Sequence, residues 1–311
     1  MRKFAAPLRL TWDWAWPPIA LPGAPLCRPS PDAVRTIGAE IVRAHVLMLE
    51  VGYPDPEALR SGELAAALAG FEGSLSLVLT PAAVVLAEER PWEALSAEDV
   101  WLDVTPGNGT IPRGLEGWSA QRFYLTAGNL EAVAAGIERA VASGATAISL
   151  PNLPLFGEVL REAEDATPDA RHLTALAARI AAALHGRPAV DVRVHHYGLW
   201  QALSAAGVHP HGEGSPGAGG CQAGNALAYI DPAGVLYPCA SLPVPLARVD
   251  IGAIAAAWSD PALTALREGI TQVPGTCAGC ASEPTCRGGC RGWAHYLNGT
   301  WNAPGPDCVK P

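Results

Sequence analysis

The sequence predicts an α/β protein with two domains, and three observations lead to this prediction. Short apolar strand patterns alternate with amphipathic helix patterns through the N-terminal part of the chain. A stretch rich in glycine and proline follows at residues 207–220, which is typical of a linker. Seven of the eight cysteines lie beyond it. We therefore divide the 311 residues into a βα domain (1–206), a linker (207–220) and a cysteine-rich domain (221–311).

Seven segments of the first domain have the pattern of β-strands. In residues 8–16, large apolar side chains alternate with smaller or more polar ones, which gives the period of two that a strand requires. Several other segments are continuous apolar runs, as in parallel sheets that are covered on both faces. The six strands that follow the first are predicted at residues 45–51, 75–79, 100–104, 122–126, 146–150 and 190–195.

Four helical patterns lie between these strands. The clearest spans residues 130–141, with Asn129 expected to cap its start and Gly144 its end. Helices at 31–43 and 56–69 begin with proline, whose missing N–H costs nothing in the first turn. A fourth helix is predicted at 171–185. Strand and helix alternate about seven times, which indicates either a partial barrel or a doubly wound sheet.

Composition excludes several classes of function. Apolar residues make up 49% of the chain and charged residues 16%, so a folded globule is expected. The net charge of −9 argues against a nucleic-acid partner, because binding to phosphates requires a basic face. We find no run of 18 apolar residues and no signal-peptide pattern, and therefore expect a cytoplasmic protein without a membrane partner. Hydrolase and nucleotide-binding motifs are absent from the sequence.

The C-terminal cysteines recur at short, defined spacings. In order, the pattern is Cys221, twelve residues, Gly234, four residues, Cys239, then after a gap Cys277-x2-Cys280-x5-Cys286-x3-Cys290, seventeen residues and Cys308. Thiols at such spacings can converge on one small centre without straining the backbone. A disulfide framework is disfavoured, because such frameworks belong mainly to short secreted domains. Spacing alone leaves both zinc and iron–sulfur sites open.

The complete pattern resembles the SPASM domain at the C-terminus of many radical S-adenosylmethionine (SAM) enzymes. The resemblance covers residues 221–308 and includes the turn Asp231-Pro232-Ala233-Gly234 and the segment Pro304-Gly305-Pro306-Asp307-Cys308. In that family the domain holds two auxiliary [4Fe-4S] clusters. Carried over to this chain, the resemblance implies one cluster bound by Cys221, Cys239 and Cys290 and another bound by Cys277, Cys280, Cys286 and Cys308. The first set has only three cysteines, which implies an open iron or a ligand of another type.

The βα domain lacks two elements of the family's catalytic site. Radical SAM enzymes place a CxxxCxxC motif after the first strand, where this chain contains only Cys27. Their Gly-Gly-Glu-Pro turn corresponds here to Val51-Gly52-Tyr53-Pro54, which lacks the glutamate. The resemblance therefore implies an α/β fold with a degenerate partial (βα) barrel of radical SAM type, followed by a small cysteine-rich SPASM iron–sulfur domain. S-adenosylmethionine is not expected as a cofactor, nor radical chemistry of the chain's own.

These features favour a non-catalytic iron–sulfur protein. The chain resembles the SPASM-domain protein of the GeoRSP peptide-modification type system, which implies an active radical SAM/SPASM maturase and its precursor peptide as partners. Its role would be electron relay, peptide docking or both, since thiolate-ligated clusters cycle by one electron. Two alternatives stay open: an enzyme that binds substrate at the open iron of the Cys221, Cys239 and Cys290 cluster, and a structural adaptor that holds zinc.

Several other side chains have a structural interpretation and a functional one. Trp12, Trp14 and Trp16 are expected to fill the core, although the last two could line a peptide groove. Cys27 is expected to be a small buried apolar residue, a role that free cysteine often has, with a vestige of the lost motif and a stray ligand as the alternatives.

The histidines also have two interpretations. His195, His196 and Tyr197 end a strand, where βα barrels place their sites, but the sequence offers no third catalytic partner. His209 and His211 lie in the glycine- and proline-rich linker and are expected to be solvated, with a ligand role for the open cluster as the alternative.

Overall fold

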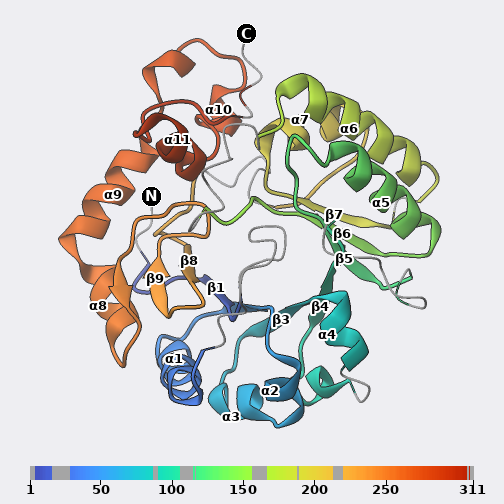
Figure 1. Ribbon diagram of the computed structural model, residues 1–311. Coiled ribbons are helices and arrows are strands. Elements are labelled where there is room, and N and C mark those ends of the chain that lie inside the picture. Colours follow the sequence, from blue (N-terminus) through green and yellow to red (C-terminus); the bar gives the residue numbers. More distant parts are fainter. Residues whose placement is uncertain are drawn as a thin grey trace. The chain divides into compact units, whose positions relative to one another are not determined.

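The computed structural model describes residues 4–15, 29–86, 90–105, 115, 117–155, 167–187, 189–212, 220–306 and 308 (Figure 1). Trp16 and Cys27, both of which are expected to be buried, lie outside these residues. The chain forms two compact units, each built from two segments. The first unit comprises Met1–Trp101 and Gln222–Glu268, and the second comprises Leu102–Cys221 and Gly269–Pro311. The predicted boundaries of the βα domain, linker and cysteine-rich domain stay predictions.

The sheet of the first unit has the strand order β10-β9-β8-β1-β2-β3. Its strands are β1 (Arg9–Asp13), β2 (Met48–Gly52), β3 (Ser74–Leu79), β8 (Leu227–Ile230), β9 (Val235–Tyr237) and β10 (Ala247–Arg248). β1 pairs in parallel with both β2 and β8, whereas β9 pairs antiparallel with β8 and β10. A strand from the predicted cysteine-rich domain thus extends the sheet that the N-terminal strand begins.

The helices of the first unit confirm one prediction and correct another. They are α1 (Pro31–Arg43), α2 (Pro56–Arg60), α3 (Glu63–Ala67), α4 (Pro81–Leu86), the 3-10 helix η1 (Pro91–Leu95), α8 (Ala253–Ser259) and the first part of α9 (Pro261–Thr271). α1 has the predicted bounds, and the Ser30 hydroxyl caps it by accepting the N–H of Ala33 at 3.2 Å. The single helix predicted at 56–69 is wrong, because Gly62 has a φ of 74° and separates α2 from α3.

A buried carboxylate joins α1 to the start of α8. The side chain of Glu40 is 1% exposed and accepts the backbone N–H groups of Gly252 at 2.6 Å and Ile254 at 2.9 Å. It therefore supplies the acceptors that the first turn of α8 lacks within the helix, and its negative charge lies at the positive end of the helix dipole.

The core of the first unit contains two of the three tryptophans in the N-terminal strand pattern. Trp12 and Trp14 are 0% and 1% exposed, and their ring centroids lie 5.3 Å apart. The prediction that they fill the core is therefore confirmed for these two residues, and neither lines an open groove.

The second unit contains a parallel sheet flanked by helices. Its strands follow the order β4-β5-β6-β7, namely β4 (Asp99–Asp103, from Leu102 on), β5 (Ala120–Arg122), β6 (Ala147–Leu150) and β7 (Asp191–Val194). Its helices are α5 (Leu130–Ala142), α6 (Ala170–Leu184), α7 (Tyr197–Ala205), the 3-10 helix η3 (Gly275–Cys277), α10 (Glu283–Cys286) and α11 (Arg291–Asn298). The α/β prediction is confirmed.

Two predictions near β5 were wrong for one physical reason. The strand predicted at 122–126 ends at Arg122, and Asn129 does not cap α5 with its side chain. Instead, the Asn129 side chain accepts the N–H of Thr126 at 2.9 Å and donates to the carbonyl of Tyr124 at 3.0 Å. The asparagine thus folds the preceding segment into a turn, which competes with both strand and cap. Gly144 follows α5 with a φ of 100°, as expected for a residue after a helix end.

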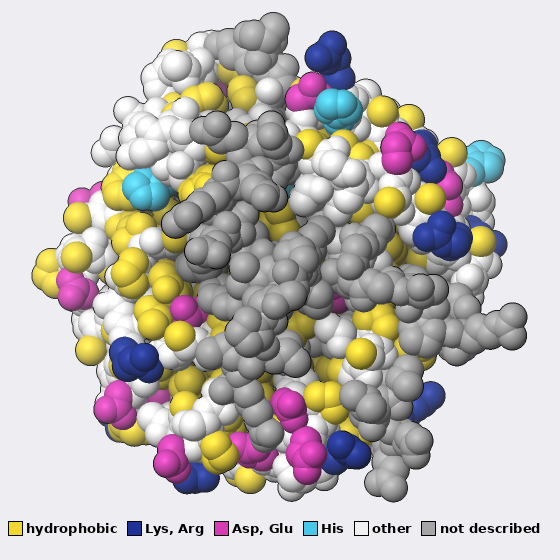
Figure 2. All heavy atoms as spheres, in the orientation of Figure 1, with side chains coloured by type: hydrophobic (Ala, Val, Ile, Leu, Met, Phe, Trp, Pro, Cys, Tyr) yellow, Lys and Arg dark blue, Asp and Glu magenta, His cyan; other side chains and the backbone are white. Residues whose placement is uncertain are grey.

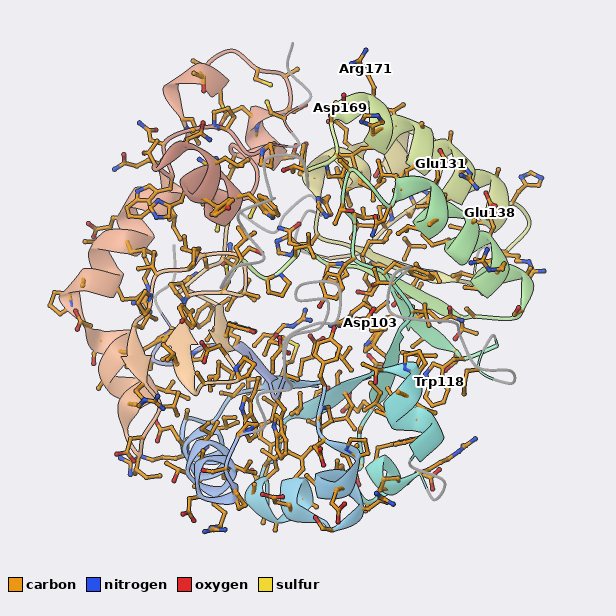
Figure 3. The ribbon with its side chains drawn as sticks, viewed as in Figure 1. Asp103, Trp118, Glu131, Glu138, Asp169 and Arg171 are labelled. Carbon is orange, nitrogen blue, oxygen red and sulfur yellow. The ribbon has the colours of Figure 1, made fainter. Side chains whose placement is uncertain are left out.

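An arginine from α6 fixes the packing of α6 against α5. Glu131 and Glu138 lie along α5 (Figure 3). Both accept hydrogen bonds from Arg179 of α6, at 2.7 Å and 2.8 Å respectively. Asp169 begins α6 by accepting the N–H of His172 at 2.8 Å. Helix α6 packs in turn against α7, which follows β7 in sequence.

The described surface carries charges of both signs. On the face drawn in Figure 2, lysine and arginine side chains stand singly among aspartates and glutamates. Within the part of the chain that the structure describes, no helix combines the length and apolar character needed to cross a membrane.

Candidate metal centre

Tight turns bring the cysteines between 277 and 290 close together in the chain's path. Cys277 ends η3, and the N–H of Cys280 returns to the carbonyl of Cys277 at 3.0 Å. Cys286 ends α10, and Cys290 is the residue before α11. Gly288, between the last two cysteines, has a φ of 94°, a conformation that favours glycine. The short spacings therefore fold into consecutive turns, each ending at a thiol.

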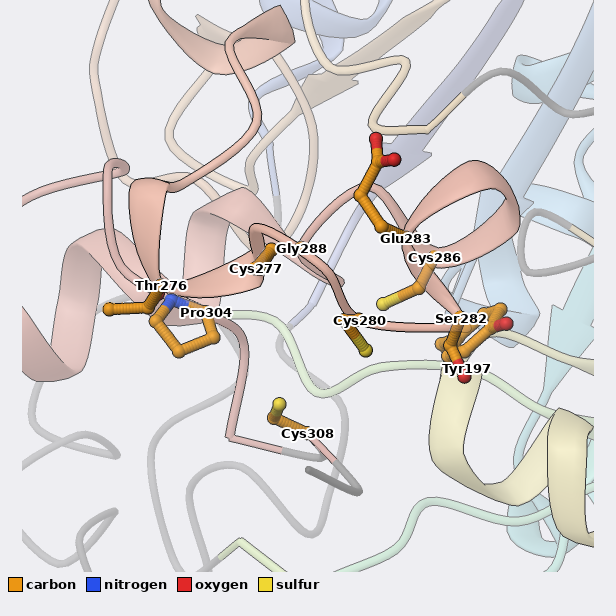
Figure 4. A pocket seen from close by; sticks show the side chains of 10 residues that line it. All are labelled: Tyr197, Thr276, Cys277, Cys280, Ser282, Glu283, Cys286, Gly288, Pro304 and Cys308. Atoms are coloured by element: carbon orange, nitrogen blue, oxygen red, sulfur yellow. The ribbon is translucent and has the colours of Figure 1, made fainter. Parts of the chain in front are cut away.

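Four thiols line one cavity in the second unit. The cavity has a volume of about 230 Å³ and is lined by Tyr197, Thr276, Cys277, Cys280, Ser282, Glu283, Cys286, Gly288, Pro304 and Cys308 (Figure 4). Cys280, Cys286 and Cys308 project into the same space from different segments. The four cysteines are the set that the family resemblance assigns to one cluster, and all are thiols rather than disulfides.

Backbone hydrogen bonds connect the segment of Cys308 to that of the other three thiols, although twenty-one residues lie between Cys286 and Cys308. The N–H of Gly305 donates to the carbonyl of Gly288 at 2.8 Å, and the N–H of Cys308 donates to the carbonyl of Gly305 at 3.1 Å. The segment before Cys308 is therefore tied to the turn between Cys286 and Cys290.

A buried arginine strengthens the same connection. Arg291 is 0% exposed, and its guanidinium donates to the carbonyls of Trp301 at 3.0 Å, Ala303 at 2.8 Å and Gly288. Burial lowers the pKa of Arg291, because a low-dielectric environment disfavours its charge. Four thiols act on this pKa in the opposite direction: those of Cys221, Cys290, Cys277 and Cys286. Sequence reasoning missed Arg291, since the first position of a helix gives no periodic signal of burial.

Helix α7 forms another wall of the cavity. The Tyr197 hydroxyl lies 2.5 Å from the Thr285 hydroxyl, and the Gln201 side chain donates to the Ser282 hydroxyl at 3.2 Å. These contacts hold α7 against the loop between Cys280 and Cys286. The sequence drew attention to Tyr197 only as the end of a strand, and nothing in the sequence indicated that it would line the cavity.

The three cysteines assigned to the other cluster fall in both units. Cys221 and Cys290 belong to the second unit and Cys239 to the first. Cys239 follows the hairpin of β8 and β9, whose turn at Asp231–Gly234 is confirmed by the positive φ of Gly234, 77°. The Asp231 carboxylate closes this turn by accepting the N–H of Val235 at 2.8 Å. The grouping of these three cysteines stays a prediction.

The donor set around the cavity suits a cluster. No three described His, Cys, Asp or Glu side chains are placed to hold one metal ion. A [4Fe-4S] cluster instead spreads four thiolates over four iron atoms, so its ligands surround a volume and do not meet at a point. Four thiols that line one cavity fit this requirement.

The turn after β2 packs against an acidic residue that sequence reasoning missed. A Cβ atom at Gly52 would lie 1.9 Å from the Oδ1 atom of Asp13, so any side chain at this position would have to displace the carboxylate. Asp13 is 4% exposed and accepts the Tyr229 hydroxyl at 3.0 Å. Tyr53 is also buried, with a φ of 54°. Asp13 could have been found from the sequence, because it is an acidic residue within an otherwise apolar strand pattern.

The histidines have separate surroundings. His196 is 7% exposed and lies directly before the first residue of α7. His195 lies between the end of β7 and His196. His209 and His211 are exposed, as expected for solvated residues. The backbone of His211 nevertheless pairs with β7, so the start of the predicted linker is ordered along that strand.

Comparison with known proteins identifies the fold class. The chain has an α/β fold of radical SAM type, as predicted, because it matches structures of that fold over nearly its whole length. One is SuiB from Streptococcus suis bound to the precursor peptide SuiA, with a TM-score of 0.64 and 14% identity over 97% of this chain and 75% of SuiB. SuiB bound to S-adenosylmethionine matches with a TM-score of 0.62 and 14% identity, over 97% and 76% of the two chains.

A second protein of this fold matches along most of its own length. anSMEcpe with bound AdoMet and Kp18Cys peptide has a TM-score of 0.61 and 12% identity, covering 92% of this chain and 90% of anSMEcpe. At such identities the likeness shows the fold alone. No protein-family model matches the chain, and no curated protein matches its sequence.

Proposed function

We propose that this chain is an iron–sulfur protein that carries two [4Fe-4S] clusters and acts as the non-catalytic partner of a radical SAM/SPASM peptide maturase. The observation that carries the proposal is the cavity lined by Cys277, Cys280, Cys286 and Cys308. Four thiols from three separate turns and a distant segment surround one space, and none of them forms a disulfide. A reducing cytoplasm would keep them available as ligands.

The chain's own residues would hold the cluster and limit the access of water. Four thiolates would bind it, while Tyr197, Thr276 and Pro304 cover the sides of the cavity. When bound, such a cluster supplies one-electron transfer, at a potential set by ligation, nearby charge, hydrogen bonds and solvent exposure. The other cluster would be held by Cys221, Cys239 and Cys290, with one iron open or bound by a residue of another type.

The degenerate barrel supports a role beside another enzyme. The sequence has no CxxxCxxC motif, and its turn after β2 lacks the glutamate that would bind the cofactor's amino group. That turn is instead committed to packing, since Gly52 lies against Asp13 and Tyr53 is buried. SuiB and anSMEcpe, which share the fold, were solved with peptides bound. We infer that the barrel of this chain docks the maturase or its precursor peptide and does not bind S-adenosylmethionine.

Metal analysis of the anaerobically reconstituted chain tests the clusters. Two [4Fe-4S] clusters correspond to about eight iron and about eight acid-labile sulfide per chain. Cys286→Ala should remove about half of both, because it removes one ligand of one complete set. Cys27→Ala, the matched change at the only cysteine outside the two sets, should leave both contents unchanged. Zinc without sulfide would refute the clusters and favour a zinc-bound adaptor.

Activity assays test the partner role. The reconstituted chain with reductant and S-adenosylmethionine should release no 5′-deoxyadenosine, and appreciable release would refute a non-catalytic barrel. Added to an active maturase and its peptide, the chain should increase modification, and Cys286→Ala should reduce that increase. If the isolated chain turns over a small substrate and Cys221→Ala abolishes this turnover, the alternative of an enzyme with an open iron is favoured.

A further inference from the structure

Arg291 is a buried cation for which the described residues provide no carboxylate. Its side chain is 0% exposed, and the acceptors that it reaches are the carbonyls of Gly288, Trp301 and Ala303. A charge removed from water is costly unless anions lie nearby, and carbonyl dipoles supply only part of that compensation. The position of Arg291 therefore calls for an anionic neighbour.

The three carbonyls show what this arginine holds in place. Gly288 lies between two cysteines, Cys286 and Cys290, whereas Trp301 and Ala303 belong to the segment that leads to Cys308. One planar guanidinium thus connects the two parts of the chain that must stay together for four thiols to surround the cavity. The fit is close, because a Cβ atom at Gly288 would lie 2.6 Å from Nη2 of Arg291. A lysine could not make these three bonds in one plane.

One donor of Arg291 is left over. Its Nε atom is buried and has no hydrogen-bond partner among the described residues. A buried N–H without an acceptor is costly, so such a group calls for an explanation. Arg291 directly follows Cys290 and its guanidinium binds the carbonyl of Gly288, which lies between Cys286 and Cys290; the thiols of Cys221, Cys290, Cys277 and Cys286 also act electrostatically on it. These four come from both of the predicted ligand sets.

We propose that Arg291 is a positioning residue for both clusters: its guanidinium clamps the Cys308 segment onto the Cys286–Cys290 turn, and its fixed charge favours the reduced state. This inference rests on the proposed function, because the anions that offset the charge are the cluster thiolates. Reduction adds one electron to an already anionic cluster, and no proton or bond change is required. A nearby buried cation is weakly screened and therefore raises the reduction potential.

Redox titration of the anaerobically reconstituted full chain tests the charge. Dithionite is the reductant, and paramagnetic resonance reports the reduced clusters. Arg291→Gln should lower the equilibrium constant for cluster reduction about tenfold, which is about 59 mV for a one-electron couple. Arg291→Lys should keep the wild-type potential, because it keeps the charge. If Arg291→Gln binds full iron and sulfide at an unchanged potential, the proposal is wrong.

Iron content tests the clamp. Arg291→Lys and Arg291→Gln should both lose cluster faster than wild type under a chelator, because neither can make the three carbonyl bonds in one plane. Equal rates of loss in all three proteins would overturn this half of the proposal. If Arg291→Gln fails to fold, Arg291→Lys still decides: a lowered potential at full iron content contradicts the charge role, and an unchanged one supports it.

Arg267 offers a matched control. It is also a buried arginine that donates to backbone carbonyls, those of Gly224 and Trp258, but no cysteine acts on its pKa. Arg267→Gln should lower stability without changing the reduction potential, and a potential shift as large as that of Arg291→Gln would refute a local charge effect. A wild-type chain without sulfide would instead refute the proposed function itself, so the two failures are distinguishable.

Discussion

Replacing Gly288 with alanine is the sharpest test of how the cavity is built. Gly288 has a φ of 94°, where an alanine costs about 1 kcal/mol or more. The new Cβ atom would also lie 2.6 Å from Nη2 of Arg291 and 2.7 Å from Cδ of Pro274. The guanidinium is held by three carbonyls and cannot move freely aside. Overpacking of this kind costs about 1–3 kcal/mol, and the displaced charged hydrogen bond costs about as much again.

The matched control is a glycine in the same group of turns. Gly279 also has a positive φ, 71°, but an added Cβ atom would meet nothing within 4 Å. Gly279→Ala should therefore cost only the backbone term of about 1 kcal/mol, and Gly288→Ala about 3–7 kcal/mol in total. Urea unfolding of the metal-free full chain measures both costs, and iron analysis after reconstitution should show a loss for Gly288→Ala alone. Equal destabilisation by the two variants would show that the packing of Gly288 against Arg291 does not determine the site.

Two further predictions concern the first unit. Glu40→Gln should lower the free energy of unfolding by about 2–3 kcal/mol. The carboxylate accepts two charge-assisted hydrogen bonds from the start of α8, whereas the amide keeps only one acceptor and its NH2 group faces the other N–H. Glu57→Gln, at an exposed side chain, should cost less than about 0.5 kcal/mol in the same urea experiment, and a similar cost for both would contradict the capping role. Burial and then the Asp231 carboxylate raise the pKa of Tyr237 to about 12, so its neutral form is favoured in the folded state. Wild-type stability should therefore fall as pH rises from 10 to about 12, and Tyr237→Phe should reduce that fall in alkaline unfolding curves; an unchanged fall would count against the assignment.

Local sequence patterns predicted most of the secondary structure. Helix α1 has the bounds that its proline and apolar periodicity predict, since both signals act within a few residues. The predictions failed where a side chain bound the backbone nearby, as Asn129 does beside Tyr124, or where one glycine broke a helical pattern, as Gly62 does. Such choices depend on small differences between competing local hydrogen bonds, and composition alone does not reveal them.

The sequence by itself determined which thiols are available and how tightly their turns must fold, because spacings of two, five and three residues leave few backbone paths between the cysteines from Cys277 to Cys290. Only the tertiary structure decided that Cys308 and Tyr197 join them around one cavity, that Arg291 lies buried against the carbonyl of Gly288, and that β8 pairs with β1. These contacts join residues far apart in the chain. They are selected by packing and by hydrogen bonds of the whole unit, which short-range spacing does not encode.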